Sequence, residues 1–276
     1  MGEGGSLRRT QILGLPIDPL TMDAAIERVE RAIQQRSRLL IGVVNAAKLV
    51  NLRRDGELRD AVLACDMLLA DGMSVVWAGR LLRRRLPERV TGIDLMLRML
   101  EVADRRGYRV FFLGATEEVL SATVARIRRE YPGVCVAGAR NGYFGGEEES
   151  RVAAQIATAQ PDMLLVAMSS PNKELFLRRW SSHMDVPVLH GVGGAFDVYA
   201  GKVRRAPPLW QRRGMEWFYR VLQEPRRLWK RYLVTNTLFT LLVLRELLLG
   251  PLPLLAAESM AGGPARLENR QKDCLA

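Results

Sequence analysis

The chain has 276 residues, of which 48% are hydrophobic and 26% are charged, and this composition excludes a disordered or collagen-like polymer. Its three cysteines lie far apart in the sequence, which excludes a disulfide framework and a cysteine-based zinc cluster and fits a reducing compartment. The formal net charge of +11 predicts an anionic partner.

Short apolar segments alternate with amphipathic segments before residue 203. The apolar segments span residues 39–45, 66–72, 108–115, 134–142, 162–170 and 186–194. Nearly continuous hydrophobicity is typical of strands whose sheet is covered by helices on both faces. The alternation of strands and helices therefore predicts an α/β fold, a Rossmann-like and mostly parallel sheet flanked by helices.

Small and polar residues recur where these predicted strands end. The candidate ligand-binding residues at the strand ends are Asn45, Asp71, Gly114, Asn141, Ser170, Gly193 and Gly194. The carboxyl ends of parallel strands face one crevice, which is where open α/β sheets bind ligands. Glycine and asparagine could also serve only the turns. The same bias at six strand ends, one of which carries a carboxylate, favours a ligand site.

Two glycine-rich turns, at 112–116 and 191–197, would let the backbone approach a phosphate or a sugar closely. Neither turn has the pattern GxGxxG, and the chain has no GxxxxGK[ST], which disfavours a dinucleotide-binding fold of the usual kind and a P-loop. The chain also lacks the DxD pattern by which many sugar-nucleotide enzymes hold a metal and a diphosphate. We therefore expect no metal and no cofactor, and cationic side chains for any bound diphosphate.

The composition of the chain changes after residue 203. Residues 204–231 contain nine arginines and lysines, two acids and three of the five tryptophans, and an apolar run follows at 233–244. Arg245 and Glu246 are expected to end this run, which leaves it shorter than the roughly twenty residues of a membrane span. Basic and aromatic residues beside an apolar helix predict a helical appendage on an anionic membrane surface. A solvated basic face docked on the sheet, or an oligomer interface, is the alternative.

These features predict three parts of the chain, an α/β catalytic domain over 1–203, a basic and aromatic helical appendage over 204–257 and a disordered tail over 258–276. Nucleic acid is disfavoured as the anionic partner because the long leucine runs are not needed there and no motif for DNA or RNA binding is present. An exposed apolar helix would favour self-association, so a homo-oligomer is possible.

Eight successive segments resemble the WecG/TagA/CpsF glycosyltransferases, glycosyltransferase family 26. The segments are residues 43–55, 70–80, 88–95, 111–116, 131–144, 169–174, 191–207 and 214–227. The resemblance implies an inverting, metal-independent transferase that moves a sugar from a UDP-sugar to an undecaprenyl-diphosphate-linked acceptor. It also implies a peripheral protein at the cytoplasmic face of the cell membrane, acting in the biosynthesis of cell-surface polysaccharides.

The resemblance assigns roles to individual residues. It places the catalytic base on Asp71 and donor-pocket positions on Asn45 and Arg89. The arginines that close over the site in the family fall on Arg220 and Arg227. An inverting transfer needs a single carboxylate to take the proton of the acceptor hydroxyl, which suits Asp71. A structural aspartate that caps the next helix is the alternative.

The family's G-x-P-K-Q-E segment reads Ser-Ser-Pro-Asn-Lys-Glu at residues 169–174. Lys173 replaces a glutamine there, so a donor such as a uronic acid or a different hexose is possible and N-acetylmannosamine is not assumed. Glu174 could contact a ligand or pair with Lys173 or an arginine, and Asp197 could bind sugar hydroxyls or cap a helix. His190 is expected to be a hydrogen-bonded core residue.

Two other classes of function compete with this interpretation. The first is a nucleotide-binding Rossmann-like enzyme of another class, against which the missing glycine motifs speak. The second is a non-enzymatic protein that binds anionic membranes, which would not need polar residues at six strand ends.

Overall fold

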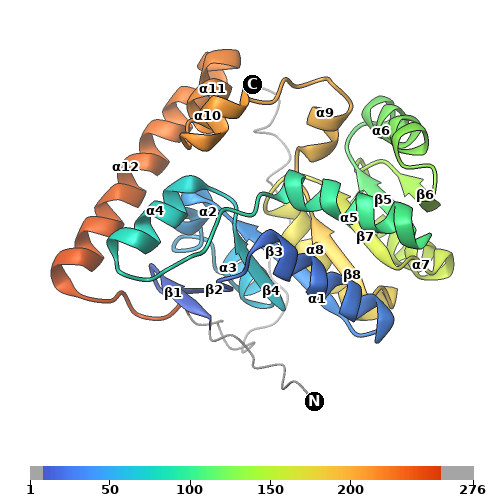
Figure 1. The fold of residues 1–276 in the computed structure, drawn as a ribbon, viewed down its shortest axis with the longest axis horizontal. Helices are drawn as coiled ribbons and strands as arrows, with labels where there is room; N and C mark the ends of the chain where they lie inside the picture. Colours follow the sequence, from blue (N-terminus) through green and yellow to red (C-terminus); the bar gives the residue numbers. More distant parts are fainter. Residues whose placement is uncertain (1–8, 256–276) are drawn as a thin grey trace.

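The computed structural model describes residues 9–255, apart from the side chains of Pro208, Arg212, Arg220, Arg227, Leu228 and Arg231 (Figure 1). The strands are β1 (Thr10–Ile12), β2 (Leu15–Ile17), β3 (Leu39–Val44), β4 (Met67–Ala70), β5 (Arg109–Gly114), β6 (Cys135–Arg140), β7 (Met163–Ala167) and β8 (Val188–Gly191). The helices before β5 are α1 (Met22–Gln34), α2 (Ala46–Asn51), α3 (Gly56–Leu63), α4 (Met73–Leu81) and α5 (Gly92–Arg106). The later helices are α6 (Glu117–Glu130), α7 (Glu149–Ala159), α8 (Asn172–Met184), α9 (Ala195–Tyr199), α10 (Pro208–Arg212), α11 (Glu216–Gln223) and α12 (Pro225–Leu249).

Six strands form one sheet in the order β4-β3-β8-β7-β5-β6, and each pairing is parallel. They are the six apolar segments that the sequence predicts, so the α/β Rossmann-like fold is confirmed. β1 and β2 form a separate antiparallel hairpin. Nothing in the sequence pattern predicts the hairpin, because each of its strands has three residues, too few to show a period of two.

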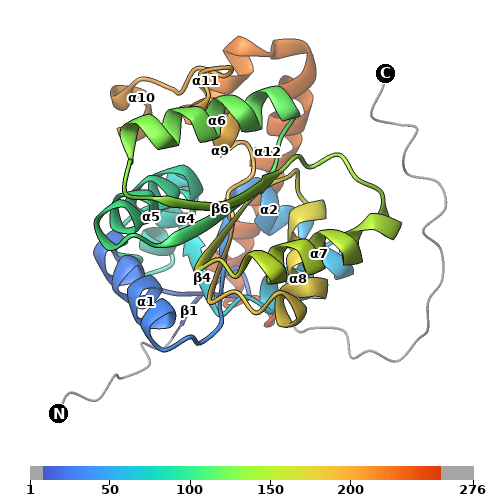
Figure 2. The same cartoon turned by 90° about the vertical axis from the view of Figure 1, so that its right-hand side faces the viewer.

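The sheet lies between two layers of helices, as Figure 2 shows from the side. Successive side chains of a strand point to opposite faces of the sheet, so one strand can contribute side chains to both hydrophobic cores. Phe111 and Leu113 of β5 belong to the core shared with α2, α3, α7 and α8. Phe112, between them, belongs to the core shared with α1, α5, α6 and α9. The apolar strand segments are therefore continuous because both faces of the sheet are buried.

Side-chain caps fix where several helices begin. Thr21, Thr91 and Thr116 each accept a hydrogen bond from a backbone amide in the first turn of the helix that follows. Gly107 ends α5 with φ of 70°, the left-handed conformation in which glycine carries no steric cost. Thr91 and the first turn of α5 matter most for the site described below.

Both outer edges of the sheet are modified. At the β4 edge, Asp18 donates its backbone N–H to Leu68 O at 2.8 Å and accepts from Leu68 N with its carboxylate, also at 2.8 Å. At the β6 edge, the register with β5 shifts between Val110 and Phe111. Gly138 lies against the Phe111 ring there, since a Cβ at this glycine would fall 2.5 Å from a ring carbon.

The carboxyl-terminal helix α12 runs through Arg245 and Glu246, so the prediction that these residues end the apolar segment is wrong. Glu246 lies on the inner face of the helix, with its side chain 1% exposed, and pairs with Arg84, which also donates to Gln11 O at 2.7 Å. Phe239, on the same face, packs into the core that includes α2. The two charges therefore do not interrupt the helix, because one of them is buried in an ion pair.

The described part of the predicted appendage, residues 204–255, contains α10, α11 and α12. The helix α12 packs along α2, and its carboxyl-terminal extension returns to the hairpin, where Leu255 N donates to Gly14 O at 2.8 Å. The division of the chain into three parts stays a prediction, and the predicted tail at 258–276 lies outside the described residues.

Candidate active site

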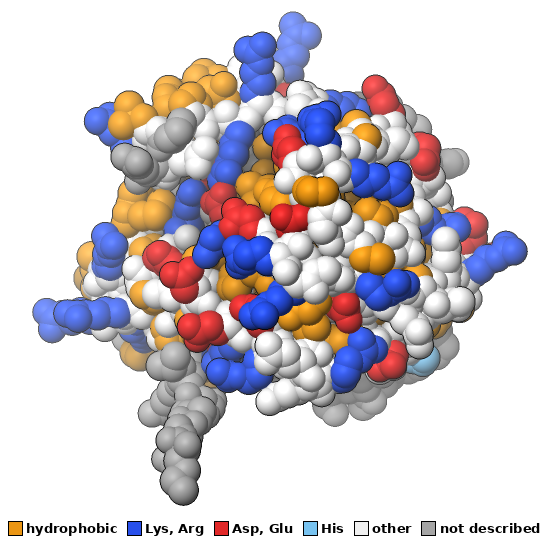
Figure 3. Space-filling model, turned by 45° about the vertical axis from the view of Figure 1, so that its right-hand side comes forward, with side chains coloured by type: hydrophobic (Ala, Val, Ile, Leu, Met, Phe, Trp, Pro, Cys, Tyr) orange, Lys and Arg blue, Asp and Glu red, His pale blue; other side chains and the backbone are white. Residues whose placement is uncertain are grey.

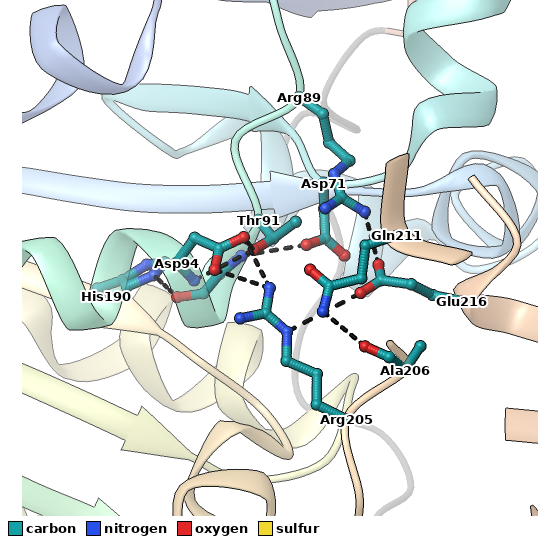
Figure 4. A network of polar contacts seen from close by, with 10 residues as sticks. Asp71, Arg89, Thr91, Asp94, His190, Arg205, Ala206, Gln211 and Glu216 are labelled. Atoms are coloured by element: carbon teal, nitrogen blue, oxygen red, sulfur yellow. Dashed lines mark hydrogen bonds and ion pairs between the residues drawn. The ribbon is translucent and has the colours of Figure 1, made fainter. Parts of the chain in front are cut away.

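Asp71 lies where β4 ends, at the carboxyl edge of the sheet, and is partly exposed. Its backbone N–H donates to Val44 O at 2.8 Å, which ties it to the neighbouring strand β3. Its Oδ1 accepts from the backbone N–H of Gly92 at 3.1 Å, the first residue of α5 (Figure 4). The positive end of this helix stabilises a negative carboxylate. Asp71 does not cap α4, because Gly72 is the residue at that position.

His190, in strand β8 of the sheet, contacts the same end of α5. It is fully buried in β8, and its Nε2 lies 3.2 Å from Gly92 O, which can only accept a hydrogen bond. Burial lowers the pKa of His190 to about 4, so the ring is neutral and carries its proton on Nε2. The prediction of a hydrogen-bonded core histidine is confirmed, and the backbone of Gly92 contacts both residues, His190 through its carbonyl and Asp71 through its N–H.

Arg89 lies in the loop that leads into α5, three residues before Gly92. Its side chain is 13% exposed, and its Nη1 lies 2.6 Å from Glu216 Oε2 in the first turn of α11. Figure 4 draws this pair in the same view as Asp71. An element of the predicted appendage therefore contacts Arg89, one of the candidate donor-pocket residues.

A second arginine, Arg205, joins the same network. Its Nη2 lies 2.7 Å from Asp94 Oδ1 and 2.8 Å from Asp94 Oδ2, and its Nε lies 4.0 Å from Glu216 Oε1. Asp94 also accepts from the Thr91 hydroxyl at 2.6 Å. The network therefore joins the start of α5 to the segment 204–216 by charge-assisted bonds.

Gly214 brings the turn between α10 and α11 against α4. A Cβ at this glycine would lie 2.7 Å from Met73 Cβ and 2.8 Å from the Trp77 ring, and its φ is 64°. Both facts favour glycine here, because a side chain would need space and a conformation that other residues rarely adopt. We call residues 208–223, which form α10, α11 and this turn, the lid.

Asn45 caps α2 at the end of β3, where its Oδ1 accepts from Lys48 N at 3.0 Å. The Lys48 ammonium donates to Glu174 Oε1 at 2.7 Å, and Lys173 reaches the same oxygen at 2.7 Å. Of the alternatives for Glu174, the pairing with Lys173 is therefore present. Lys173 and Glu174 are 7% and 8% exposed, so this triad lies inside the protein.

Burial and the Lys48 charge lower the pKa of Lys173 to about 8. Burial acts to raise the pKa of Glu174, but attraction by Lys48 and Lys173 outweighs it and holds that pKa below its ordinary value. The triad therefore joins α8 to α2, the helix that Asn45 caps. Contact of Lys173 or Glu174 with a ligand stays a prediction.

The remaining candidates lie along the same edge of the sheet. Gly114 ends β5 with φ of 120°, and a Cβ there would lie 2.3 Å from Ala167 O, so the turn requires glycine. Asn141 joins the loop after β6 to α6 by donating to Glu117 Oε2 at 2.9 Å. Ser170 is exposed after β7.

The turn after β8 contains Gly193 and Gly194, and Gly194 is the residue that caps α9. Asp197 lies within α9, so it is not the cap of this helix. Arg220 lies in α11 and Arg227 in α12, and their side chains lie outside the described part of the structure. The roles of all these residues stay predictions.

Three charged residues of the site are missing from the sequence-based candidates, namely Asp94, Arg205 and Glu216. Asp94 follows Thr91 by three residues, the spacing of a helix cap, and this pattern predicts a structural role alone. Nothing in the sequence pairs Arg205 with Asp94 or Glu216 with Arg89, because these contacts join residues more than 100 positions apart. Among the described residues, no group of three or more His, Cys, Asp and Glu side chains is placed to hold a metal ion.

Comparison with known proteins relates this chain to an enzyme family. Residues 10–251 match the model of the glycosyl transferase WecG/TagA/CpsF family. A relative from Bacillus spizizenii strain W23 is 41% identical over 175 residues, which are 63% of this chain and 67% of the relative. A relative from Bacillus subtilis strain 168 is 36% identical over 214 residues, or 78% of this chain and 82% of the relative. Both are named N-acetylglucosaminyldiphosphoundecaprenol N-acetyl-beta-D-mannosaminyltransferase.

Proposed function

Because the chain belongs to the WecG/TagA/CpsF family of glycosyltransferases, we propose that it transfers a sugar from a UDP-sugar to a polyprenyl-diphosphate-linked glycan, with inversion and without a metal ion. The observation that carries the proposal is the position of Asp71, a partly exposed carboxylate between the start of α5 and the lid. The acceptor belongs to the class that the names of both relatives specify.

In the proposed reaction, an acceptor hydroxyl oxygen attacks C1 of the donor sugar from the face opposite UDP. Asp71 takes the hydroxyl proton as the new C–O bond forms, and the electrons of the breaking C1–O bond leave with UDP. A positioned general base of this kind contributes about 10²- to 10⁴-fold to a rate. The Gly92 amide supports this role because it holds one carboxylate oxygen in place.

The leaving UDP gains negative charge as the bond breaks, so the site has to supply positive charge without a metal ion. Arg89 and Arg205 are the described cations of the network in Figure 4. Planar guanidinium groups suit this task because they bind phosphate oxygens in pairs. We assign Arg89 to the diphosphate of the donor.

The acceptor is lipid-linked, so the proposal includes a peripheral position on the anionic, cytoplasmic face of the membrane. Apolar and basic side chains lie side by side at the upper left of Figure 3, where Figure 1 places α10 and α11. The segment Tyr232–Leu249 of α12 is long and apolar enough to cross a membrane by length and composition, and 22% of it is buried. Exposed leucines beside cations favour an anionic bilayer surface.

The test of the activity is a transfer assay with purified protein. We expect product from one of a panel of UDP-sugars, UDP-N-acetylmannosamine and a UDP-uronic acid included, with an N-acetylglucosaminyl-diphosphate lipid as acceptor. EDTA should leave the rate unchanged, because arginines and helix amides stabilise the leaving group. Dependence on added magnesium or manganese would overturn the metal-free mechanism, and no product with any UDP-sugar would overturn the donor class.

The membrane proposal predicts that Leu248→Ser with Leu249→Ser lowers binding to vesicles containing phosphatidylglycerol by about tenfold or more, because two leucines no longer enter the bilayer. These side chains are 78% and 79% exposed, so the substitutions should not disturb the core. The control is Tyr143→Ser, which removes a side chain that is also 78% exposed but lies in the loop after β6. Co-sedimentation of the double variant at the wild-type level would contradict the proposal.

A further inference from the structure

The arginine assigned to the donor diphosphate is already paired with a carboxylate of the lid. Arg89 Nη1 lies 2.6 Å from Glu216 Oε2, and the two side chains are 13% and 28% exposed. The other oxygen of Glu216 lies 4.0 Å from Arg205, whose closest contact is Asp94 at 2.7 Å. A carboxylate therefore lies where two cations converge, the arrangement in which proteins bind phosphate groups.

Both described guanidinium groups of this network are already paired with carboxylates. The network of Figure 4 contains two guanidinium groups, Arg89 and Arg205, and three carboxylates, Asp71, Asp94 and Glu216. A diphosphate would have to compete with Glu216 for Arg89. The negative charges of a diphosphate and of the Glu216 carboxylate would repel each other beside Arg89. This repulsion is stronger where water is largely excluded than on an open surface.

Glu216 is also part of the structure that covers the site. It lies in the first turn of α11, two residues after Gly214, which is packed against Met73 and Trp77 of α4. Exchange of Glu216 for another anion at Arg89 therefore breaks an ion pair that joins the lid to the loop before α5.

We propose that Glu216 is a positioning residue that occupies the diphosphate position of Arg89, and that a diphosphate-bearing ligand replaces it there and releases the start of α11. This inference rests on the proposed function, which supplies two ligands of this chemistry. One is the UDP-sugar donor and the other is the lipid diphosphate of the acceptor.

The test measures the affinity of the full-length chain for three probes. UDP represents the donor, farnesyl diphosphate represents the acceptor, and uridine carries no phosphate. We expect Glu216→Gln to tighten binding of UDP or of farnesyl diphosphate by about three- to tenfold, because the neutral amide competes less for Arg89. Uridine binding should not change. The probe that is tightened identifies which diphosphate takes the position of Glu216.

A second readout and two further variants separate this role from a purely structural one. Amide hydrogen exchange over residues 208–223 should be faster in Glu216→Gln than in the wild-type chain, both without ligand. Glu216→Asp keeps the charge and should restore affinities near the wild-type values. Glu27→Gln is the control, because it removes one acid from the exposed surface of α1.

Weaker or unchanged binding of both diphosphates by Glu216→Gln overturns the inference, as does an equal change for uridine. If UDP does not bind to either chain but farnesyl diphosphate binds more tightly to the variant, the proposed donor is wrong and the role of Glu216 stands. If UDP binds equally to both chains and farnesyl diphosphate does too, the donor stands and the role of Glu216 fails.

Discussion

Substitution of Asp71 by asparagine is expected to lower the rate of sugar transfer by about 10²- to 10⁴-fold while binding of UDP is retained. Asparagine has nearly the same shape, and its Oδ1 can still accept from the Gly92 amide, as the aspartate does at 3.1 Å. What it loses is the ability to take a proton. Rates of product formation at saturating donor, with UDP affinity measured by calorimetry, separate loss of chemistry from loss of binding.

A matched control for this variant is Asp23→Asn in the first turn of α1, a residue whose side chain is 81% exposed. It removes the same charge on an exposed surface and should leave the transfer rate near that of the wild-type chain. Transfer by Asp71→Asn at a similar rate would remove Asp71 as the base. Loss of UDP binding together with transfer would instead indicate a structural or donor-binding role.

The second large effect concerns the attachment of α12 to the body of the protein. Arg84→Ala is expected to lower the free energy of unfolding by about 2–4 kcal/mol, because it leaves the Glu246 carboxylate buried without its partner. The Glu246 side chain is 1% exposed, so water cannot replace the arginine without rearrangement of α12. Urea unfolding of the two chains measures the difference.

Two further variants make this result specific. Arg85→Ala removes an exposed neighbouring arginine and should change the free energy of unfolding by less than about 0.5 kcal/mol. Arg84→Met combined with Glu246→Leu replaces the buried pair by apolar side chains and should recover most of the lost stability. Equal stabilities of Arg84→Ala and Arg85→Ala would show that the pair does not hold α12.

The sequence predicts the sheet well because its signal is local. Five of the six strands are short apolar runs that are mostly buried, and their polar residues gather at the strand ends, as Asn45 and Asp71 do. The edge strand β6 is only partly buried. Gly107 was predictable for the same reason, since a helix end that needs positive φ favours glycine. In contrast, the hairpin β1–β2 is too short to leave a periodic signal.

The lid contacts could not be predicted from the sequence because they depend on how distant segments meet. The pairs Arg89–Glu216 and Arg84–Glu246 join residues 127 and 162 positions apart, and no local pattern specifies either pair. In the sequence, a charged residue inside an apolar run indicates that the run ends there. In the structure, Glu246 is instead buried within α12 and paired with Arg84. The Lys173–Glu174 pair differs from these, because its two residues are neighbours in the sequence and their pairing was one of the alternatives that the sequence left open.

The two modified edges of the sheet bear on how copies of this chain could associate. Asp18 fills the hydrogen-bonding positions of Leu68 on β4, so that strand has no free amide and carbonyl at this point for a strand from another molecule. At the other edge, the register shift between β5 and β6 makes the edge strand β6 irregular, which disfavours regular pairing with a further strand. Extension of the sheet from one copy into the next is therefore disfavoured, and this protects a highly apolar sheet from edge-to-edge aggregation. This favours helical surfaces, such as the exposed leucines of α12, over strand pairing for the predicted homo-oligomer.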